Sequence, residues 1–268
     1  MNDTMNDTFN RKRFGWLLKK TLLERPVQMF GLIGLILVVS LLLYAVCRSL
    51  MGFEAAQNVS FIFGLVGGGS FLASFVFNYF GSNASGSSYL TLPASHFEKW
   101  LCGVIIAGII FTLLFLIFFR IMDSTFILLY HNSLDAKNPY YKEMYESVLT
   151  YPLDGFVAGK CYMMFLNFTG VMLIGSLYFN KAVFIKVALI VCGIYIGGHF
   201  LNYFMAKTIF DSLDKALPFY AAFIPIDKSF GKVLLPGYAS VAVDICFQYI
   251  IPAILWLNTY IRLREKEF

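Results

Sequence analysis

The stretch VQMFGLIGLILVVSLLLYAVC, residues 27–47, decides the fold class, because it is apolar almost throughout and carries no charged side chain. A helix rises about 1.5 Å per residue, so a helix of this length crosses a hydrocarbon core about 30 Å thick. Backbone groups in lipid have no water to bond, and the alternation of a barrel strand is absent. The stretch therefore predicts a transmembrane helix.

Five further stretches have the same character, and the chain as a whole is 59% hydrophobic with a mean hydropathy of +0.70. The loops between them are too short for a separate soluble domain of ordinary size. The sequence thus predicts an all-α, polytopic membrane protein with one transmembrane domain over residues 1–268. The expected spans are residues 27–47, 59–80, 100–119, 156–179, 187–206 and 238–261.

The placement of charge predicts the orientation. With the N-terminus in the cytoplasm, more than half of the 21 Lys and Arg residues lie on the cytoplasmic side, as the positive-inside rule requires. An even number of spans then places both termini in the cytoplasm. The net charge of +5 is explained by membrane orientation and does not indicate nucleic-acid binding.

Two segments outside the spans have a predicted structure. Residues 9–25 form a basic amphipathic helix, in which Leu17 and Leu18 lie on one side and Trp16 favours the lipid interface; a simple basic flank of the first span is the alternative. Residues 207–237 contain apolar runs too short to cross and interrupted by proline. They predict a partly re-entrant loop or a cover over the outer mouth, with an ordinary packed loop as the alternative.

Small residues recur at helix-packing spacing in two spans. Gly64 and Gly68 form a GxxxG pattern in the second span, and Gly193 and Gly197 repeat it in the fifth. Small residues let helices approach closely in lipid, either within the chain or against a second copy. The candidate residues for helix packing or a substrate path are Gly64, Gly68, Ser70, Gly193, Gly197 and His199.

Few ionisable residues lie in or near the spans, and four of them lie near the outer boundary: Arg120, Asp123, Lys160 and Asp244. Arg120 and Asp123 stand three residues apart on a helix and could pair. These residues serve either structural pairing and snorkelling or a substrate path. Carboxylates near the bilayer midplane, which ion-coupled transport needs, are almost absent.

The chain carries no motif for catalysis or for a cofactor. The phosphate-binding pattern G-x-x-x-x-G-K-[ST], HExxH and the calcium-binding EF-hand loop are all absent, and the three histidines are far apart in sequence. We therefore expect no catalytic residue, no metal site and no cofactor in this chain.

The segment between the second and third spans carries the most specific motif. Ser95 followed by Glu98 is a capping-box pattern, with Pro93 just upstream, and it predicts a short cytoplasmic helix that runs into the third span. The apolar residues Tyr89, Leu90, Leu92 and Phe97 on its outer face need a partner surface or the lipid interface.

The stretch YLTLPASHFEKWL, residues 89–101, is similar to the L-P-[VA]-S-x-x-E-x-[WL] segment of type-2 permeases of bacterial ABC exporters, and the order of spans resembles that family over the whole chain. The resemblance implies that residues 90–100 are a coupling helix that binds a separate ATPase subunit, which would hold ATP and magnesium. The residues implied in ATPase coupling are Leu90, Leu92, Pro93, Ser95, Phe97, Glu98, Lys99 and Trp100. Leu92 and Phe97 would anchor the helix, Pro93 and the Ser95–Glu98 box would fix its start, and Lys99 would pair with acids of the ATPase.

The resemblance also implies the bacterial inner membrane as location, membrane lipids as surroundings, and a second permease subunit in a homodimer or heterodimer. The exported substrate would be a lipid, drug, peptide or glycan. The tyrosine-rich loop 130–155 is longer than in many members, which leaves the substrate open. The alternatives are a stand-alone secondary transporter or channel, and a membrane assembly or sensor protein without transport.

Overall fold

A computed structural model describes residues 9–24, 26–77, 89, 91–209, 215–217, 221–226, 229–234 and 236–265. Six of its helical stretches are long and apolar enough to cross a membrane: Met29–Met51, Phe53–Val76, His96–Ser133, Phe156–Tyr178, Val183–Ile209 and Gly237–Arg264. This is the architecture of a largely helical, multi-pass membrane protein, as the composition predicts.

The chain begins with a short helix and two antiparallel spans. Helix α1 (Arg11–Glu24) precedes α2 (Pro26–Met51), and the second span consists of α3 (Phe53–Ile62), the π-helix η1 (Phe63–Gly68) and α4 (Gly69–Val76). The chain reverses between α2 and α3 at Gly52, whose φ of 94° lies in the region that only glycine adopts without strain. The expected end of this span, at residue 80, lies outside the described residues.

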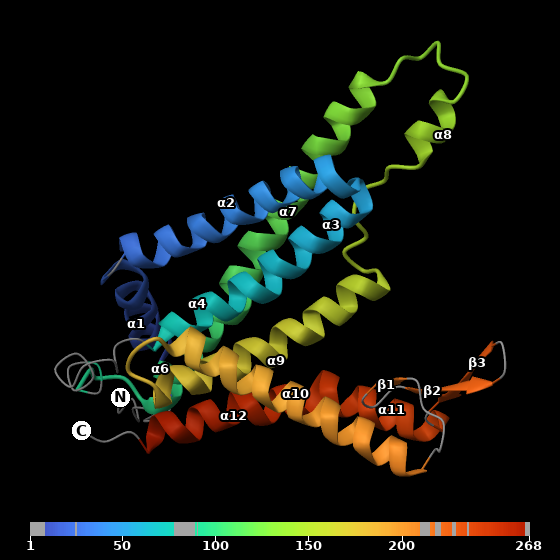
Figure 1. The fold of residues 1–268 in the computed structure, drawn as a ribbon. Coiled ribbons are helices and arrows are strands. Elements are labelled where there is room, and N and C mark those ends of the chain that lie inside the picture. Colours follow the sequence, from blue (N-terminus) through green and yellow to red (C-terminus); the bar gives the residue numbers. More distant parts are fainter. Residues whose placement is uncertain are drawn as a thin grey trace.

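The third span is much longer than predicted. Helix α6 (His96–Val104), η3 (Ile105–Ile110) and α7 (Phe111–Ser133) form one continuous helix of 38 residues, about 57 Å long. Its far end projects beyond the turn between α2 and α3 and leads to the short helix α8 (Tyr141–Glu146) (Figure 1). The predicted span ends at residue 119, before the polar residues Arg120 and Asp123. In the structure these two side chains are bonded to other parts of the chain, and the helix continues.

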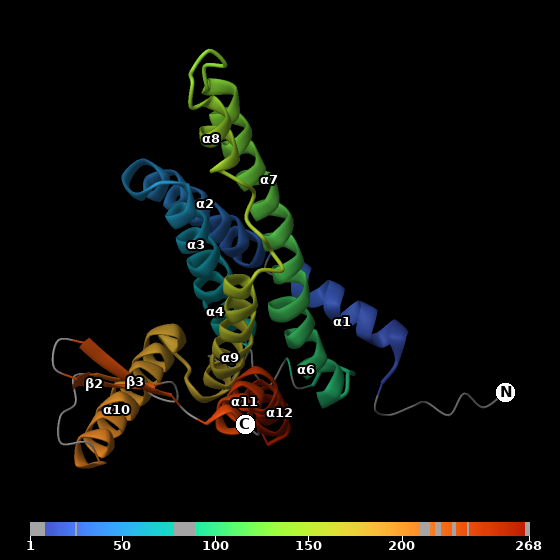
Figure 2. The same ribbon diagram turned by 90° about the vertical axis from the view of Figure 1, so that its right-hand side faces the viewer.

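Helix α9 (Phe156–Tyr178) lies at the centre of the second half and packs against both α4 and α12 (Ile251–Arg264). Helix α10 (Val183–Ile209) diverges from this bundle (Figure 2), and Val187 is its one buried residue. The last span begins with α11 (Gly237–Ile245) and the π-helix η4 (Cys246–Ile250) before α12. Because α10 is apolar and exposed along most of its length, it requires lipid or protein around it.

A small antiparallel sheet lies where a partly re-entrant loop was expected over residues 207–237. Helix α10 continues to Ile209, and the described residues beyond it form β1 (Lys215–Leu217), β2 (Ala221–Ile226) and β3 (Ser229–Leu234) in the order β1-β2-β3. Ala216 pairs with Ala222, and Ile224 pairs with Gly231. Short apolar runs between prolines cannot complete a helix, whereas paired strands satisfy their backbone groups across the sheet. The all-α description therefore holds for the spans and needs this one correction.

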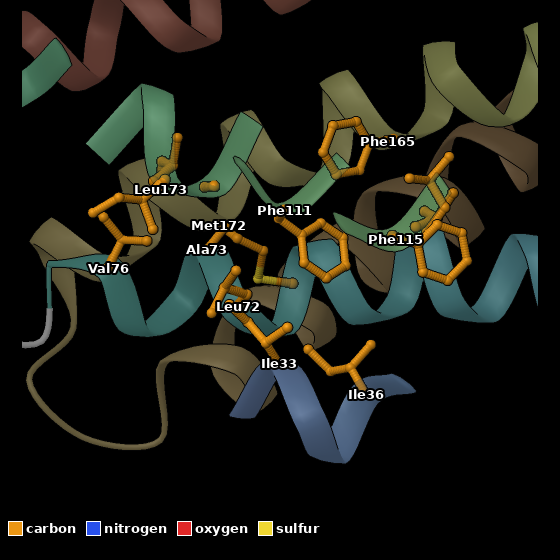
Figure 3. Close-up of a cluster of buried hydrophobic side chains, with 14 of the residues drawn as sticks. Ile33, Ile36, Leu72, Ala73, Val76, Phe111, Phe115, Phe165, Met172 and Leu173 are labelled. Atoms are coloured by element: carbon orange, nitrogen blue, oxygen red, sulfur yellow. The ribbon is translucent and has the colours of Figure 1, made fainter. Parts of the chain in front are cut away.

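The core lies between α2, α4, α7 and α9, where aliphatic and aromatic side chains interlock (Figure 3). The rings of Phe111 and Phe115 lie with centroids 6.0 Å apart, and those of Phe111 and Phe165 lie 6.3 Å apart. Ile33 and Ile36 of α2 and Leu72 of α4 close the cluster on the opposite side. In Figure 1, α1, the start of α6 and the end of α12 lie at one end of the bundle, and α8 and the sheet lie at the other.

Candidate functional site

The predicted capping box is present at the start of α6. Ser95 Oγ accepts a hydrogen bond from Glu98 N at 3.1 Å, and Ser95 N donates to Glu98 Oε2 at 2.9 Å. This reciprocal pair satisfies two backbone donors that a helix start otherwise leaves unbonded. It fixes the first residue of the long helix at His96.

Glu98 also holds helix α1. Arg13 donates to its carboxylate from Nε at 2.7 Å and from Nη2 at 3.0 Å, and Asn10 N donates to Oε1 at 2.7 Å. The Asn10 side chain in turn accepts bonds from the backbone N–H groups of Lys12 and Arg13, which caps α1. One fully buried carboxylate thus joins the starts of two helices. We call Asn10, Arg13, Ser95 and Glu98 the junction.

Two of the residues expected in ATPase coupling, Glu98 and Lys99, are both buried within the chain. The ammonium group of Lys99 lies 5.8 Å from the ring centroid of Tyr89, which is itself buried. The sequence did not show that α1 covers Glu98.

Other residues of the motif are more accessible. Pro93, His96 and Phe97 are exposed, and Leu92 is half-buried. Trp100 points inward and donates from Nε1 to the carbonyl oxygen of Trp256 at 2.9 Å, which ties α6 to α12. Leu90 lies outside the described residues.

The two GxxxG patterns have different environments. A Cβ atom at Gly64 would collide with Phe115, and one at Gly68 would collide with Ile36, so both glycines allow close packing of the second span within the chain. A Cβ atom at Gly193 or Gly197 would meet nothing within 4 Å. Gly64 and Gly68 also line a hollow of about 300 Å³ between α2 and the second span.

These environments predict opposite effects of alanine. Gly64→Ala and Gly68→Ala should each destabilise the protein by about 1–3 kcal/mol, because the added methyl group forces the packed helices apart. Gly193→Ala and Gly197→Ala should be neutral or stabilise by up to about 1 kcal/mol, since alanine favours helix more than glycine does. Thermal unfolding of the four variants in one detergent measures the difference; equal losses in both pairs would contradict the packing described here.

Ser70 and His199, the remaining path candidates, lie in different surroundings. Ser70 is buried, and its Oγ finds no hydrogen-bond partner among the described residues. His199 is half-buried on α10. In the part of the chain that the structure describes, no three His, Cys, Asp or Glu side chains come together as metal ligands.

Arg120 and Asp123 do not pair with each other among the described residues. They instead bind the backbone of one residue, Tyr151: Asp123 Oδ2 accepts from its N–H at 2.8 Å, and Arg120 Nη1 donates to its carbonyl oxygen at 3.0 Å. Asp123 Oδ1 also accepts from the Tyr44 hydroxyl at 2.8 Å and from Gln57 Nε2 at 2.9 Å. We call these five residues the outer anchor, because they join α2, α3 and α7 to the loop before α9.

Burial governs the electrostatics of the outer anchor. Asp123 is fully buried, and burial raises the pKa of the Tyr151 hydroxyl to about 12.

Lys160 and Asp244 form an ion pair at 3.0 Å between α9 and α11, and both side chains remain partly exposed. Such an exposed pair adds little stability.

Five residues of these two clusters that carry polar bonds were not predicted from the sequence: Asn10, Arg13, Tyr44, Gln57 and Tyr151. Gln57 and Tyr44 were visible as polar groups within apolar stretches, which usually require a bonding partner. The partners themselves lie 66 and 79 residues away along the chain, so local spacing gave no sign of them.

No family model, curated protein or solved structure matches this chain. The likeness to type-2 permeases consequently depends on residues 89–101 and on the order of the spans. Function is argued below from the geometry of the junction.

Proposed function

We propose that the chain is the membrane-spanning permease subunit of an ABC exporter and acts with a second permease subunit and a separate ATPase. On this proposal it lies in the bacterial inner membrane with both termini in the cytoplasm. It has no catalytic residue of its own, and the exported compound is a lipid, drug, peptide or glycan.

One observation carries the proposal: the L-P-A-S-H-F-E motif directly precedes and starts the longest helix of the protein. The capping box fixes that start, and the helix continues without interruption from His96 to Ser133. Force applied to residues 91–97 would therefore displace a single rigid helix that extends beyond the outer anchor. This is a mechanical link between one face of the membrane and the other.

The junction changes which residues would contact the ATPase. Glu98 and Lys99 act within the chain, and the accessible surface is formed by Pro93, His96 and Phe97 together with the exposed Thr91. Glu98 would act indirectly, by holding α1 against the helix that receives the push.

A stand-alone ion-coupled transporter has less support. The chain has no ATP-binding motif, so energy must come from a partner or a gradient. The buried carboxylate of α7, Asp123, accepts three hydrogen bonds from its neighbours, which is typical of a structural role rather than of a proton relay.

The proposal is tested by co-expressing the chain with an ABC ATPase subunit from the same genome. Pro93→Asp and His96→Asp should each weaken the complex about tenfold or more, because buried contacts at the centre of an interface are each worth about 1–2 kcal/mol. Lys181→Gln, an exposed change at the same end of the bundle, is the matched control. Dissociation constants from surface-immobilised full-length protein give the comparison.

Two outcomes would contradict the proposal. If binding and transport are unchanged in both Pro93→Asp and His96→Asp, these residues do not form the surface that binds the ATPase. Gradient-driven flux by the purified chain in liposomes without any ATPase would remove the exporter assignment itself.

A further inference from the structure

A groove of about 460 Å³ lies between α1 and the turn before α6. Its surface is almost wholly apolar, although two of the residues that line it are cationic. The lining is formed by Trp16 and Leu17 of α1, by Leu92, Pro93 and Ala94, and by Arg13 and Lys20. No acidic residue is among its described lining residues.

The surroundings of the groove are also basic. A second hollow, on the other side of Trp16, is lined by Arg11, Lys12 and Lys19. The Trp16 side chain is 72% exposed between the two, with the Lys19 ammonium group 5.7 Å from its ring centroid. A large exposed indole flanked by cations is typical of a surface at the level of lipid headgroups.

We propose that this groove is a binding site for one anionic phospholipid. The acyl chain lies along Trp16, Leu17 and Leu92, and the phosphate is bound by Lys20. Arg13 also lines the groove, but its guanidinium group already bonds to Glu98, so Lys20 carries the specificity for charge.

The chemistry of the groove selects this occupant. An acidic side chain of a protein partner matches the cations but does not fill an apolar space of this size, and free phosphate has nothing to place against the apolar surface. A phospholipid matches both the cations and the apolar surface. Its position on helix α1 at the end of six spans brings the groove into contact with the bilayer.

The site also has a structural consequence. Arg13 lines the groove and belongs to the junction, so a lipid that packs between α1 and Pro93 adds contacts to both halves of the junction. Bound lipid should therefore strengthen the attachment of α1 to α6. The inference does not depend on the transport function proposed above.

Native mass spectrometry of the purified full-length chain in neutral detergent tests the site. We expect it to retain phosphatidylglycerol in preference to phosphatidylcholine with the same acyl chains. Lys20→Gln should weaken retention of phosphatidylglycerol about fivefold, the value of one cation near an anionic surface, whereas Lys20→Arg should preserve it. Ala94→Trp, which fills the groove, should reduce retention of both lipids.

Lys181→Gln is the control for loss of one exposed cation at the same end of the bundle and should retain lipid as the parent does. Equal retention of the two lipids, or equal effects of Lys20→Gln and Lys181→Gln, would overturn the site. Displacement of the bound species by inorganic phosphate alone would show an anion site without an acyl chain and would overturn the assignment to a phospholipid.

Discussion

Replacing Asp123 with alanine is expected to lower the free energy of unfolding by about 3–5 kcal/mol, one of the two largest effects that the structure predicts. The change leaves three buried donors without their acceptor: the Tyr44 hydroxyl, the Gln57 amide and the Tyr151 backbone N–H. Each buried donor left unbonded costs about 1–3 kcal/mol, and losses within one cluster do not add fully.

Thermal unfolding in detergent measures this loss, and two further variants are compared with it. Glu143→Ala removes an exposed carboxylate on α8 and should change stability by less than about 0.5 kcal/mol. Asp123→Asn keeps one carbonyl oxygen but turns an amide N–H₂ toward one of the donors, so an intermediate loss is expected. A loss for Asp123→Ala no larger than that for Glu143→Ala would show that the outer anchor does not stabilise the protein.

The outer anchor also shows the limit of local spacing as a predictor. Arg120 and Asp123 were correctly placed on one helical face, and a pair three residues apart often bonds. Their actual partner is the backbone of Tyr151 in the loop before α9, 31 residues beyond Arg120 and 28 beyond Asp123. Spacing gives the face that a side chain occupies, whereas the identity of the covering segment depends on how the helices pack.

The same distinction explains the other outcomes. The spans and the capping box were predictable, because hydropathy and the Ser95–Glu98 spacing are properties of single segments. The burial of Glu98 under α1 was not, because Arg13 lies 85 residues away from it in sequence. Likewise, the patterns at Gly64 and Gly193 are identical in spacing, and only the packing against Phe115 distinguishes them.

Replacing Glu98 with alanine is expected to have the second large effect: it should release α1 from α6. The carboxylate accepts bonds from Arg13, Asn10 N and Ser95 N, and removal of one partner from a buried ionic cluster costs about 3–5 kcal/mol. Because α1 has few other buried residues, Leu17 and Thr21 among them, the loss should appear as local opening of α1.

Limited trypsin digestion of the folded protein measures that opening, since cleavage after Lys19 and Lys20 follows the population of the open form. Glu98→Ala should accelerate cleavage at these sites by about tenfold or more, an effect that needs only about 1.4 kcal/mol of the expected loss. Glu24→Ala removes an exposed acid from α1 and should leave the rate unchanged. Unaltered protection of α1 in Glu98→Ala would show that hydrophobic contacts alone hold this helix.

A double-mutant cycle separates the ion pair from the rest of the junction. If Arg13 acts through Glu98, then Arg13→Gln should add little to Glu98→Ala, and the coupling energy should lie in the range of about 1–3 kcal/mol that contacting residues show. The result decides how transport defects are interpreted. Glu98 variants that lose transport and protection of α1 together would act through the junction, whereas Pro93 variants that lose transport with α1 still protected would act at the surface proposed to bind the ATPase.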